Sequence, residues 1–106
     1  MVRQYEIYWI HLDPTVGKEI RKIRPCAVIS PNELNRGLST VLVSPITGTI
    51  REYPFRLTCR VKNKAGSIAI DQTRCVDKKR LGKRIGKLSD GEISKLKEIL
   101  HEMLIK

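Results

Sequence analysis

Residues 9–31, WIHLDPTVGKEIRKIRPCAVISP, join two apolar stretches through a highly charged connection. The first stretch, WIHL, is the second half of residues 5–12, YEIYWIHL, whose aromatic and β-branched side chains are typical of a strand. The second, CAVIS at residues 26–30, is a short apolar run that ends at Pro31, which predicts a buried strand. The connection between them holds Gly17, Lys18, Glu19, Arg21, Lys22 and Arg24. It is therefore the first place in the chain where charged groups gather beside expected buried strands.

Further short strands are expected downstream. TVLVS at residues 40–44 is another apolar run that ends at a proline, and FRLTCRVK at 55–62 alternates apolar with mostly basic residues. NKAG at 63–66 has the composition of a turn. Residues 67–76 begin as a strand and become polar, residues 77–81 predict one helical turn, and residues 85–88 predict a last strand.

One amphipathic helix is expected over residues 90–105. Ser89 and Glu92 have the S-x-x-E spacing of a capping box, and Leu88 and Ile93 occupy the positions of a hydrophobic staple. Five or six short strands followed by one helix predict a small, mostly antiparallel barrel or sandwich, and periodicity does not decide between these two.

Length, net charge and cysteine content limit the classes of function that this chain can have. The 106 residues suit a single domain, 1–106, and the net charge of +10 indicates a polyanionic partner, either nucleic acid or an anionic membrane. No apolar run approaches the ~20 residues of a membrane span, and the N-terminus does not resemble a signal peptide. The three cysteines lack metal-ligand spacing, so we expect reduced thiols, a cytoplasmic protein and no metal or cofactor.

Few side chains are candidates for chemistry. Arg24 precedes Pro25, which restricts it to extended backbone conformations and suits it to present its guanidinium to a phosphate. The alternative is a surface arginine paired with Glu19. Thr47, by itself, is only a turn residue at a strand end. A paired-histidine ribonuclease site is not favoured, because it needs both histidines in one cleft. His101 is expected to face solvent on the C-terminal helix, and His11 is expected to be a strand residue.

Two further segments have both a binding and a structural interpretation. Residues 74–87, RCVDKKRLGKRIGK, contain seven basic residues and one acid, which fits a phosphate-binding track or a solvated charged surface. Tyr53 and Phe55 can stack on unpaired bases, although Phe55 is equally well explained as a core residue.

Taken in order, these segments resemble the MazF/PemK family of toxins of type II toxin–antitoxin systems. The resemblance is carried by residues 9–31, by TVLVSPITG at 40–48, by YPF at 53–55 and by DQTRCVDKKRLGKRIGKLS at 71–89. It covers nearly the whole chain. It implies an SH3-like small barrel of the MazF/PemK/CcdB kind, mostly β with a C-terminal helix, that forms a two-fold homodimer.

The resemblance also implies an activity, partners and site residues. The activity is a sequence-specific, metal-independent cleavage of single-stranded RNA, which a cognate antitoxin protein blocks. Arg24 falls on the family's catalytic arginine, Thr47 on its catalytic threonine, and Glu19 on an acidic loop residue that we take as the candidate general base. The expected RNA-binding residues are Lys18, Arg51, Tyr53, Phe55, Asp71, Gln72 and Arg74.

The chain departs from one branch of the family at two positions. Lys18 stands where that branch has a catalytic histidine, and Ala69 stands where it has a second arginine. We therefore expect Arg24 and Thr47 to be the catalytic residues, with Glu19 as the candidate general base. Three rival functions remain open from the sequence: a toxin of the same fold that poisons DNA gyrase without cleaving RNA, a plain basic nucleic-acid-binding module, and a membrane-surface protein. The last is the least favoured, because the one amphipathic helix carries charges of both signs and is needed to close the core.

Overall fold

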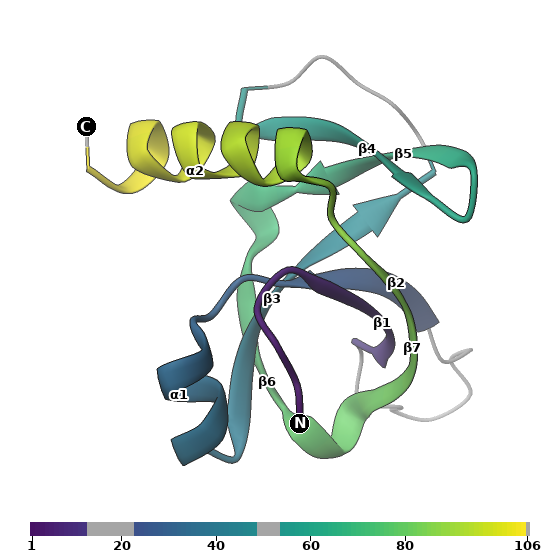
Figure 1. Cartoon of the computed structure of the whole chain (residues 1–106), viewed down its shortest axis with the longest axis vertical. Coiled ribbons are helices and arrows are strands. Elements are labelled where there is room, and N and C mark those ends of the chain that lie inside the picture. The colour runs from purple at the N-terminus through teal and green to yellow at the C-terminus, as the bar shows by residue number, and fades with distance from the viewer. Residues whose placement is uncertain (13–22, 49–53, 106) are drawn as a thin grey trace, which may run out of the picture.

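The computed structural model describes residues 1–12, 23–48 and 54–105, in which seven strands and two helices form a curled sheet with a helix across one end (Figure 1). The strands are β1 (Glu6–His11), β2 (Ile23–Val28), β3 (Thr40–Thr47), β4 (Arg56–Val61), β5 (Lys64–Ala69), β6 (Arg74–Asp77) and β7 (Leu81–Lys87). The helices are α1 (Asn32–Gly37) and α2 (Asp90–Leu104), and the short 3₁₀ turns are η1 (Ile70–Gln72) and η2 (Lys78–Arg80).

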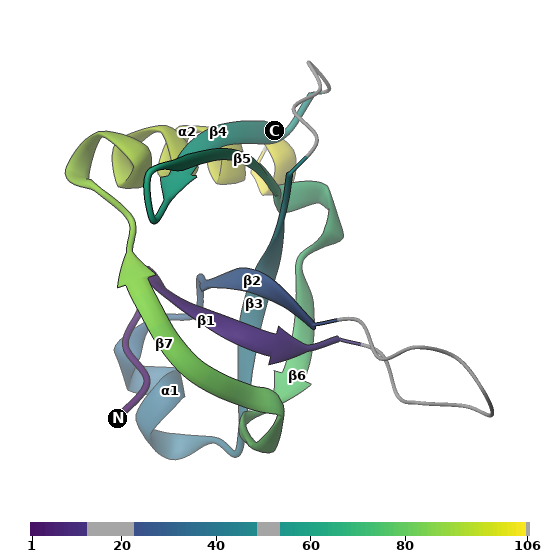
Figure 2. The same cartoon turned by 90° about the vertical axis from the view of Figure 1, so that its right-hand side faces the viewer.

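All strand pairs are antiparallel, in the order β4-β5-β3-β2-β1-β7, with β6 also paired to β3. Figure 2 shows β1 between β2 and β7, in the half of the sheet away from α2. The long strand β3 joins the two halves, because its first part pairs with β2 and β6 and its last residues pair with β5. The predicted fold class, mostly β with a C-terminal helix, is confirmed, and the sheet curls into a half-barrel.

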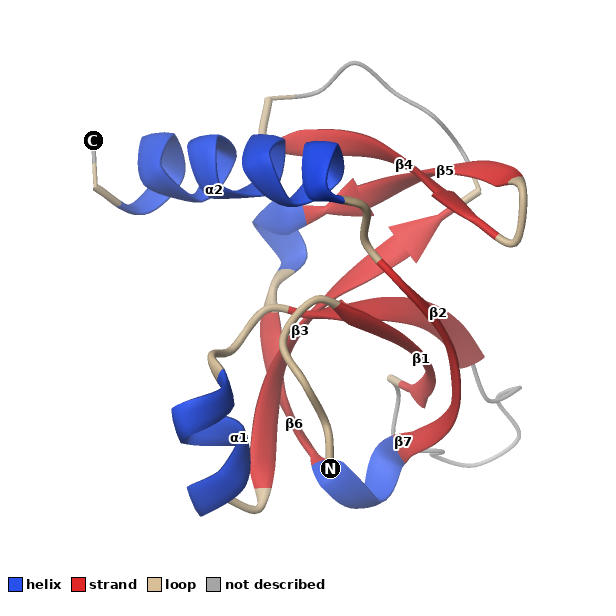
Figure 3. Ribbon diagram, viewed as in Figure 1, coloured by secondary structure: helices blue, strands red, loops and turns tan. Residues whose placement is uncertain are grey.

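Two apolar clusters hold these halves together. One lies under α2, which crosses β4 and β5 in Figure 3, and contains the fully or nearly fully buried residues Ile7, Leu57, Ile68, Leu88 and Leu96 among others. The second lies among β1, β2, β3 and β6 and includes Ile10, Cys26, Val28, Val43 and Val76. The alternation predicted for residues 55–62 is what points Leu57 and Cys59 into the first cluster.

The capping box predicted for α2 is confirmed, and it also connects the helix to the sheet. The Ser89 hydroxyl accepts from the Glu92 N–H at 3.2 Å, while one Glu92 carboxylate oxygen accepts from the Ser89 N–H at 2.8 Å. The other carboxylate oxygen accepts from the Arg60 N–H at 2.9 Å. Because β4 pairs with β5 on only one side in the described sheet, Glu92 supplies a partner on its other side.

Several elements differ from the sequence-based expectations. β2 begins at Ile23 rather than at residue 26, β3 runs on to Thr47 rather than ending at 44, and β7 begins at Leu81 rather than at 85. The hairpin between β4 and β5 turns at Lys62 and Asn63, both with positive φ, rather than over 63–66. Two positive φ values match the right-handed twist of the flanking strands, so the turn is tighter than its composition indicated.

Helix α1 was not predicted, because six residues are too few to show helical periodicity. It is held by Asn35, whose fully buried side-chain amide donates to the Ser30 carbonyl at 2.8 Å. The expectation of buried reduced thiols is confirmed at Cys26 and Cys59, which are free and buried, whereas Cys75 is exposed.

Candidate functional site: a pocket between diverging strands

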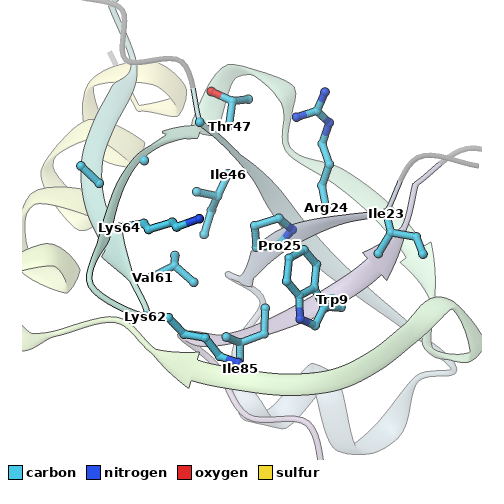
Figure 4. Close-up of a pocket in the computed structure, with 13 residues that line it drawn as sticks. Trp9, Ile23, Arg24, Pro25, Ile46, Thr47, Val61, Lys62, Lys64 and Ile85 are labelled. Carbon is cyan, nitrogen blue, oxygen red and sulfur yellow. The ribbon is translucent and has the colours of Figure 1, made fainter.

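A pocket of about 600 Å³ lies where β2 and β3 separate (Figure 4). This volume falls within the range of roughly 300–1,000 Å³ that is typical of sites for small organic ligands. Arg24 and Thr47 stand on its rim, Lys62 and Lys64 come from the neighbouring hairpin, and apolar side chains make up much of the remaining wall. It therefore contains both residues expected to be catalytic that lie within the described part of the chain.

Two prolines explain why the strands separate at this point. Pairing between β2 and β3 ends at Cys26 and Pro45. Beyond it, β2 continues against β1, with Pro25 opposite Trp9, while β3 continues against β5, with Thr47 opposite Ser67. Proline has no N–H to donate, so neither Pro25 nor Pro45 can extend the ladder between β2 and β3. The sheet opens there, and the opening is the pocket.

Arg24 and Thr47 are thus fixed by different partners. Arg24 lies opposite Ile10 of β1, and Pro25 restrains its backbone, as the sequence predicted. Figure 4 shows Arg24 and Thr47 on the same side of the pocket. Both side chains are half-buried, and no hydrogen bond or ion pair joins the Arg24 guanidinium to another described residue. A planar cation and a hydroxyl at one rim are suited to bind an anion with several oxygen atoms, such as a phosphate.

Lys62 and Lys64 add positive charge to the opposite side of the pocket. Both are exposed residues of the β4–β5 hairpin, and the Lys64 side chain extends into the pocket in Figure 4. Sequence analysis missed both residues as site candidates. No local signal marks them, because the hairpin reaches the pocket only through the pairing of β5 with β3.

Arg74, on β6, lies opposite Val43, which lies opposite Val28 of β2. Val28 and Arg24 are four residues apart on β2, so the side chains of Arg74 and Arg24 leave the sheet on the same face. Burial raises the pKa of the Cys26 thiol to about 12, and the positive charges of Arg24 and Arg74 both act on this thiol in the opposite direction. The structure brings Arg74, expected to bind RNA, toward Arg24, although it does not line the pocket.

Asp71 has a defined partner. Its two carboxylate oxygens accept from the Arg56 guanidinium, at 2.8 Å from Nε and 3.3 Å from Nη2. The Arg56 side chain is only 13% exposed, although the alternation of residues 55–62 predicts that it lies on the exposed face of its strand. The pair joins η1 to the start of β4. Asp71 is an exposed residue outside the pocket lining, and the ion pair gives it a role in positioning η1.

The remaining predicted residues divide into two groups. Gln72 is exposed on η1, and Phe55 is half-buried with a positive φ of 62° just before β4. Neither lines the pocket. Lys18, Glu19, Arg51 and Tyr53 lie outside the described residues.

The basic segment 74–87 proves to be partly structural. The Arg84 guanidinium pairs with Glu6 at 2.6 Å, Arg80 donates to the backbone carbonyls of His11 and Leu12, and the Lys78 amine donates to the Asn35 carbonyl. These contacts attach β7 and η2 to β1 and α1. The exposed Arg74, Lys79, Lys83 and Lys87 are left as the cations of this segment that face solvent.

The helices within residues 1–12, 23–48 and 54–105 include none that is long and apolar enough to cross a bilayer.

Comparison with known proteins identifies relatives over almost the whole chain. The family described as PemK-like, MazF-like toxin of type II toxin–antitoxin system matches residues 3–104. The endoribonuclease MazF of Staphylococcus saprophyticus is 31% identical over 105 residues, which cover 93% of this chain and 85% of that protein.

Solved structures show the same fold. The chain superimposes with a TM-score of 0.84 on a MazE–MazF crystal structure from Deinococcus radiodurans, at 22% identity, covering 97% of this chain and 95% of that one. It also matches an endoribonuclease in complex with its cognate antitoxin from a mycobacterial species, with a TM-score of 0.81, 20% identity and coverage of 98% and 95%. With a family match that spans residues 3–104, this chain is a member of the PemK/MazF family of toxins of type II toxin–antitoxin systems.

Proposed function

We propose that this protein is a sequence-specific, metal-independent endoribonuclease toxin that cleaves single-stranded RNA and is neutralised by a cognate antitoxin. The proposal rests on one observation: Arg24 and Thr47 both lie at the rim of one pocket in a chain of this family. Cleavage of RNA stops translation and growth, as expected of a toxin.

The pocket suggests how cleavage proceeds. The substrate's 2′-hydroxyl attacks the adjacent phosphorus, the bond from phosphorus to the 5′-oxygen breaks, and the products carry a 2′,3′-cyclic phosphate and a 5′-hydroxyl. Arg24 stabilises the negative charge that develops on the phosphoryl oxygens, since its guanidinium stays protonated at neutral pH. Thr47 donates a hydrogen bond that holds the phosphate in line for attack.

The mechanism also requires a base that takes the 2′-hydroxyl proton and a group that protonates or stabilises the leaving 5′-oxygen. Glu19 is our candidate base, and it lies outside the described residues. Arg24 also stabilises the leaving 5′-oxygen.

The other predicted residues are assigned to recognition of the substrate. Lys18, Arg51 and Arg74 contact phosphates, while Tyr53, Phe55 and Gln72 read or stack on unpaired bases. Asp71 contributes through its ion pair with Arg56, which holds η1 beside Gln72.

The proposed partners follow from charge and family. A net charge of +10 favours an acidic antitoxin segment that competes with RNA, and the working unit is a two-fold homodimer. The buried free thiols of Cys26 and Cys59 fit the reducing cytoplasm, where the RNA substrate is found.

A toxin that poisons DNA gyrase was the alternative from the sequence. It receives no support, because the relatives reported above are named MazF and endoribonuclease, and the matched family is that of MazF-like toxins.

The test is cleavage of a long, mixed-sequence RNA in EDTA by purified antitoxin-free protein, with the cut sites mapped. We expect cuts at one short repeated sequence, and loss of about 10²–10³-fold in rate for Arg24→Ala. Arg36→Ala, an exposed arginine of α1, is the matched control and should cleave normally. Cleavage by Arg24→Ala at the normal rate would remove Arg24 from the site. No cleavage by folded wild-type dimer would contradict the proposed function.

A further inference from the structure

The pairing between β1 and β7 is interrupted twice, beside the pocket. Ile7 lies opposite Gly86. Ile10 lies opposite Leu81, so four residues of β1 face six residues of β7. β7 therefore holds two extra residues, one at each interruption, which is the arrangement of a β-bulge. Bulges bend a strand and redirect its side chains, so these two affect which residues of β7 reach the pocket.

The first bulge decides which face of the sheet Ile85 occupies. In a regular ladder that continued from Ile7, Ile85 would lie opposite Tyr8 and share its face. Tyr8 packs against the cluster among β1, β2, β3 and β6, whereas Ile85 packs against the cluster under α2, which contains Ile7. Ile7 and Trp9 are two residues apart, so Ile85 lies on the face of Trp9. It reaches this face because Arg84 takes the place opposite Tyr8.

Arg84 is held opposite Tyr8 by an ion pair. Its Nε lies 2.6 Å from a carboxylate oxygen of Glu6, which is two residues from Tyr8 and therefore on the same face. The other Glu6 oxygen accepts from the Tyr8 hydroxyl at 3.0 Å and from the Arg3 N–H at 2.7 Å. The Glu6 side chain is only 12% exposed, so its charge depends on these donors. If β7 moved by one residue to restore a regular ladder, Arg84 would lie opposite Trp9, on the other face, and would lose this carboxylate.

The second bulge brings β7 close to the backbone of Trp9. Leu81 lies opposite Ile10, and both side chains pack in the cluster among β1, β2, β3 and β6. Gly82 is left beside Trp9, where a Cβ atom would lie 3.1 Å from the Trp9 carbonyl oxygen. On the other edge of β1, Trp9 lies opposite Pro25, which has no N–H to donate. The place of Trp9 in the pocket wall therefore depends on how β7 packs against it.

We propose that the Glu6–Arg84 ion pair positions the substrate, by fixing the register of β7 so that Ile85 and Trp9 form one wall of the pocket. Both side chains line the pocket, and Figure 4 shows them on the same wall. Glu6 and Arg84 are not among the described residues that line the pocket, so they act through Ile85 and Trp9. The inference rests on the proposed function, which supplies RNA as the substrate bound against this wall.

The place of the ion pair in the sheet indicates which kinetic constant it affects. Arg24 and Thr47 belong to β2 and β3, and β7 pairs with neither strand in the described sheet. A shift of β7 would therefore change the wall against which RNA rests and leave the proposed catalytic groups in place. Loss of contacts that substrate and transition state make equally raises KM and leaves kcat unchanged.

The first experiment needs no RNA, because Trp9 is the single tryptophan of the chain and its emission reports on this wall. We expect the emission of Arg84→Met to shift to longer wavelength, since the indole loses the cover of Ile85. Glu6→Gln breaks the pair from the other side and keeps a hydrogen-bond acceptor, so it should give the same shift. Arg84→Lys should not, because a lysine amine reaches the same carboxylate. Arg36→Met, at an exposed arginine of α1, is the control for the loss of one charge. Unchanged emission in folded Arg84→Met and Glu6→Gln would overturn the inference.

The second experiment measures cleavage of RNA by the same variants. Arg84→Met should raise KM about tenfold, as for a lost apolar contact in a pocket. Its kcat should stay within about twofold of wild type, whereas partial unfolding would lower kcat. Arg84→Lys should have nearly the wild-type KM. The double variant Glu6→Gln/Arg84→Met should be no worse than Arg84→Met alone, because both changes remove one interaction. Equal KM for Arg84→Met and wild type would contradict a role for the ion pair in positioning substrate.

The two proposals can fail separately. A wild-type protein that does not cut RNA, with the emission shift present in Arg84→Met, would reject the nuclease and keep the ion pair as the group that fixes the pocket wall. Cleavage by wild type, with unchanged emission and KM in Arg84→Met, would keep the nuclease and reject the role of the ion pair.

Discussion

Arg24 and Thr47 line one pocket although the strands that carry them have stopped pairing with each other. Each of the two strands is instead paired along its other edge: Arg24 of β2 lies opposite Ile10 of β1, and Thr47 of β3 lies opposite Ser67 of β5. The distance between the guanidinium and the hydroxyl is thus set by both halves of the sheet. Changes in either half, even away from the pocket, should alter cleavage through this relationship.

Replacing Thr47 by valine tests the role of its hydroxyl. The two side chains have nearly the same shape, so the variant removes a hydrogen-bond donor with little change in packing. We expect the single-turnover rate at saturating RNA to fall about 10²-fold, the usual loss for one donor to a developing phosphoryl charge. Thr47→Ser keeps the hydroxyl and should retain most of the rate. Equal rates for Thr47→Val and wild type would show that the hydroxyl has no part in cleavage.

Gly66→Ala tests the link between β5 and the pocket. A Cβ atom at this position would lie 2.9 Å from the Ile46 side chain and 3.1 Å from the Thr47 carbonyl oxygen. β3 must therefore shift at Thr47, and we expect a loss of about 1–3 kcal/mol in unfolding free energy together with slower cleavage. Gly86→Ala is the control, because a Cβ there meets nothing within 4 Å. Denaturant unfolding and cleavage assays on both variants would decide, and normal cleavage by Gly66→Ala would contradict this account of the pocket.

Glu92→Ala tests the attachment of α2 to the sheet. The variant removes the acceptor for both the Ser89 N–H and the Arg60 N–H, and we expect it to lower the unfolding free energy by about 1–3 kcal/mol. The Arg60 amide should also exchange its hydrogen faster. Glu98→Ala, at an exposed position of the same helix, should change neither quantity. Unaltered exchange at Arg60 in the Glu92 variant would mean that the carboxylate does not hold β4.

Glu6 predicts a pH dependence of stability. Burial raises its pKa, but hydrogen bonds from the Arg3 N–H, the Tyr8 hydroxyl and the Arg84 guanidinium outweigh burial, and the pKa falls below its ordinary value of 4.5. A carboxyl group whose pKa is lower in the folded state stabilises the fold above its unfolded pKa. That stabilisation is lost as the pH falls through the folded pKa.

Glu6→Gln should therefore cost about 1 kcal/mol at neutral pH, a modest loss because the Arg84 side chain is 49% exposed and can be solvated. Thermal unfolding of wild type and variant across the acidic range should show the two melting temperatures converging at low pH. A difference between them that stays constant with pH would exclude the carboxylate charge as its source.

Local sequence was sufficient for much of the fold. The alternation in residues 55–62 gave β4, and the S-x-x-E spacing of Ser89 and Glu92 gave the start of α2, because both signals depend on near neighbours. The same reasoning missed α1, which is too short to show a period and is held by the buried Asn35. It also ended β3 too early, because Pro45 suggests a strand end unless the change of partner from β2 to β5 is known.

For the candidate site, the sequence by itself determined that the backbone of Arg24 is restrained, since Pro25 acts on its immediate neighbour. Only the tertiary structure decided that Arg24 and Thr47 line one pocket, that Lys62 and Lys64 reach it, and that Asp71 is held by Arg56. It also decided that Trp9 is open to the pocket, a fact that a strand pattern cannot reveal because alternation predicts a face and not what covers it. These relationships join residues far apart in the chain, through strand pairings and a separation of two strands that no local pattern encodes.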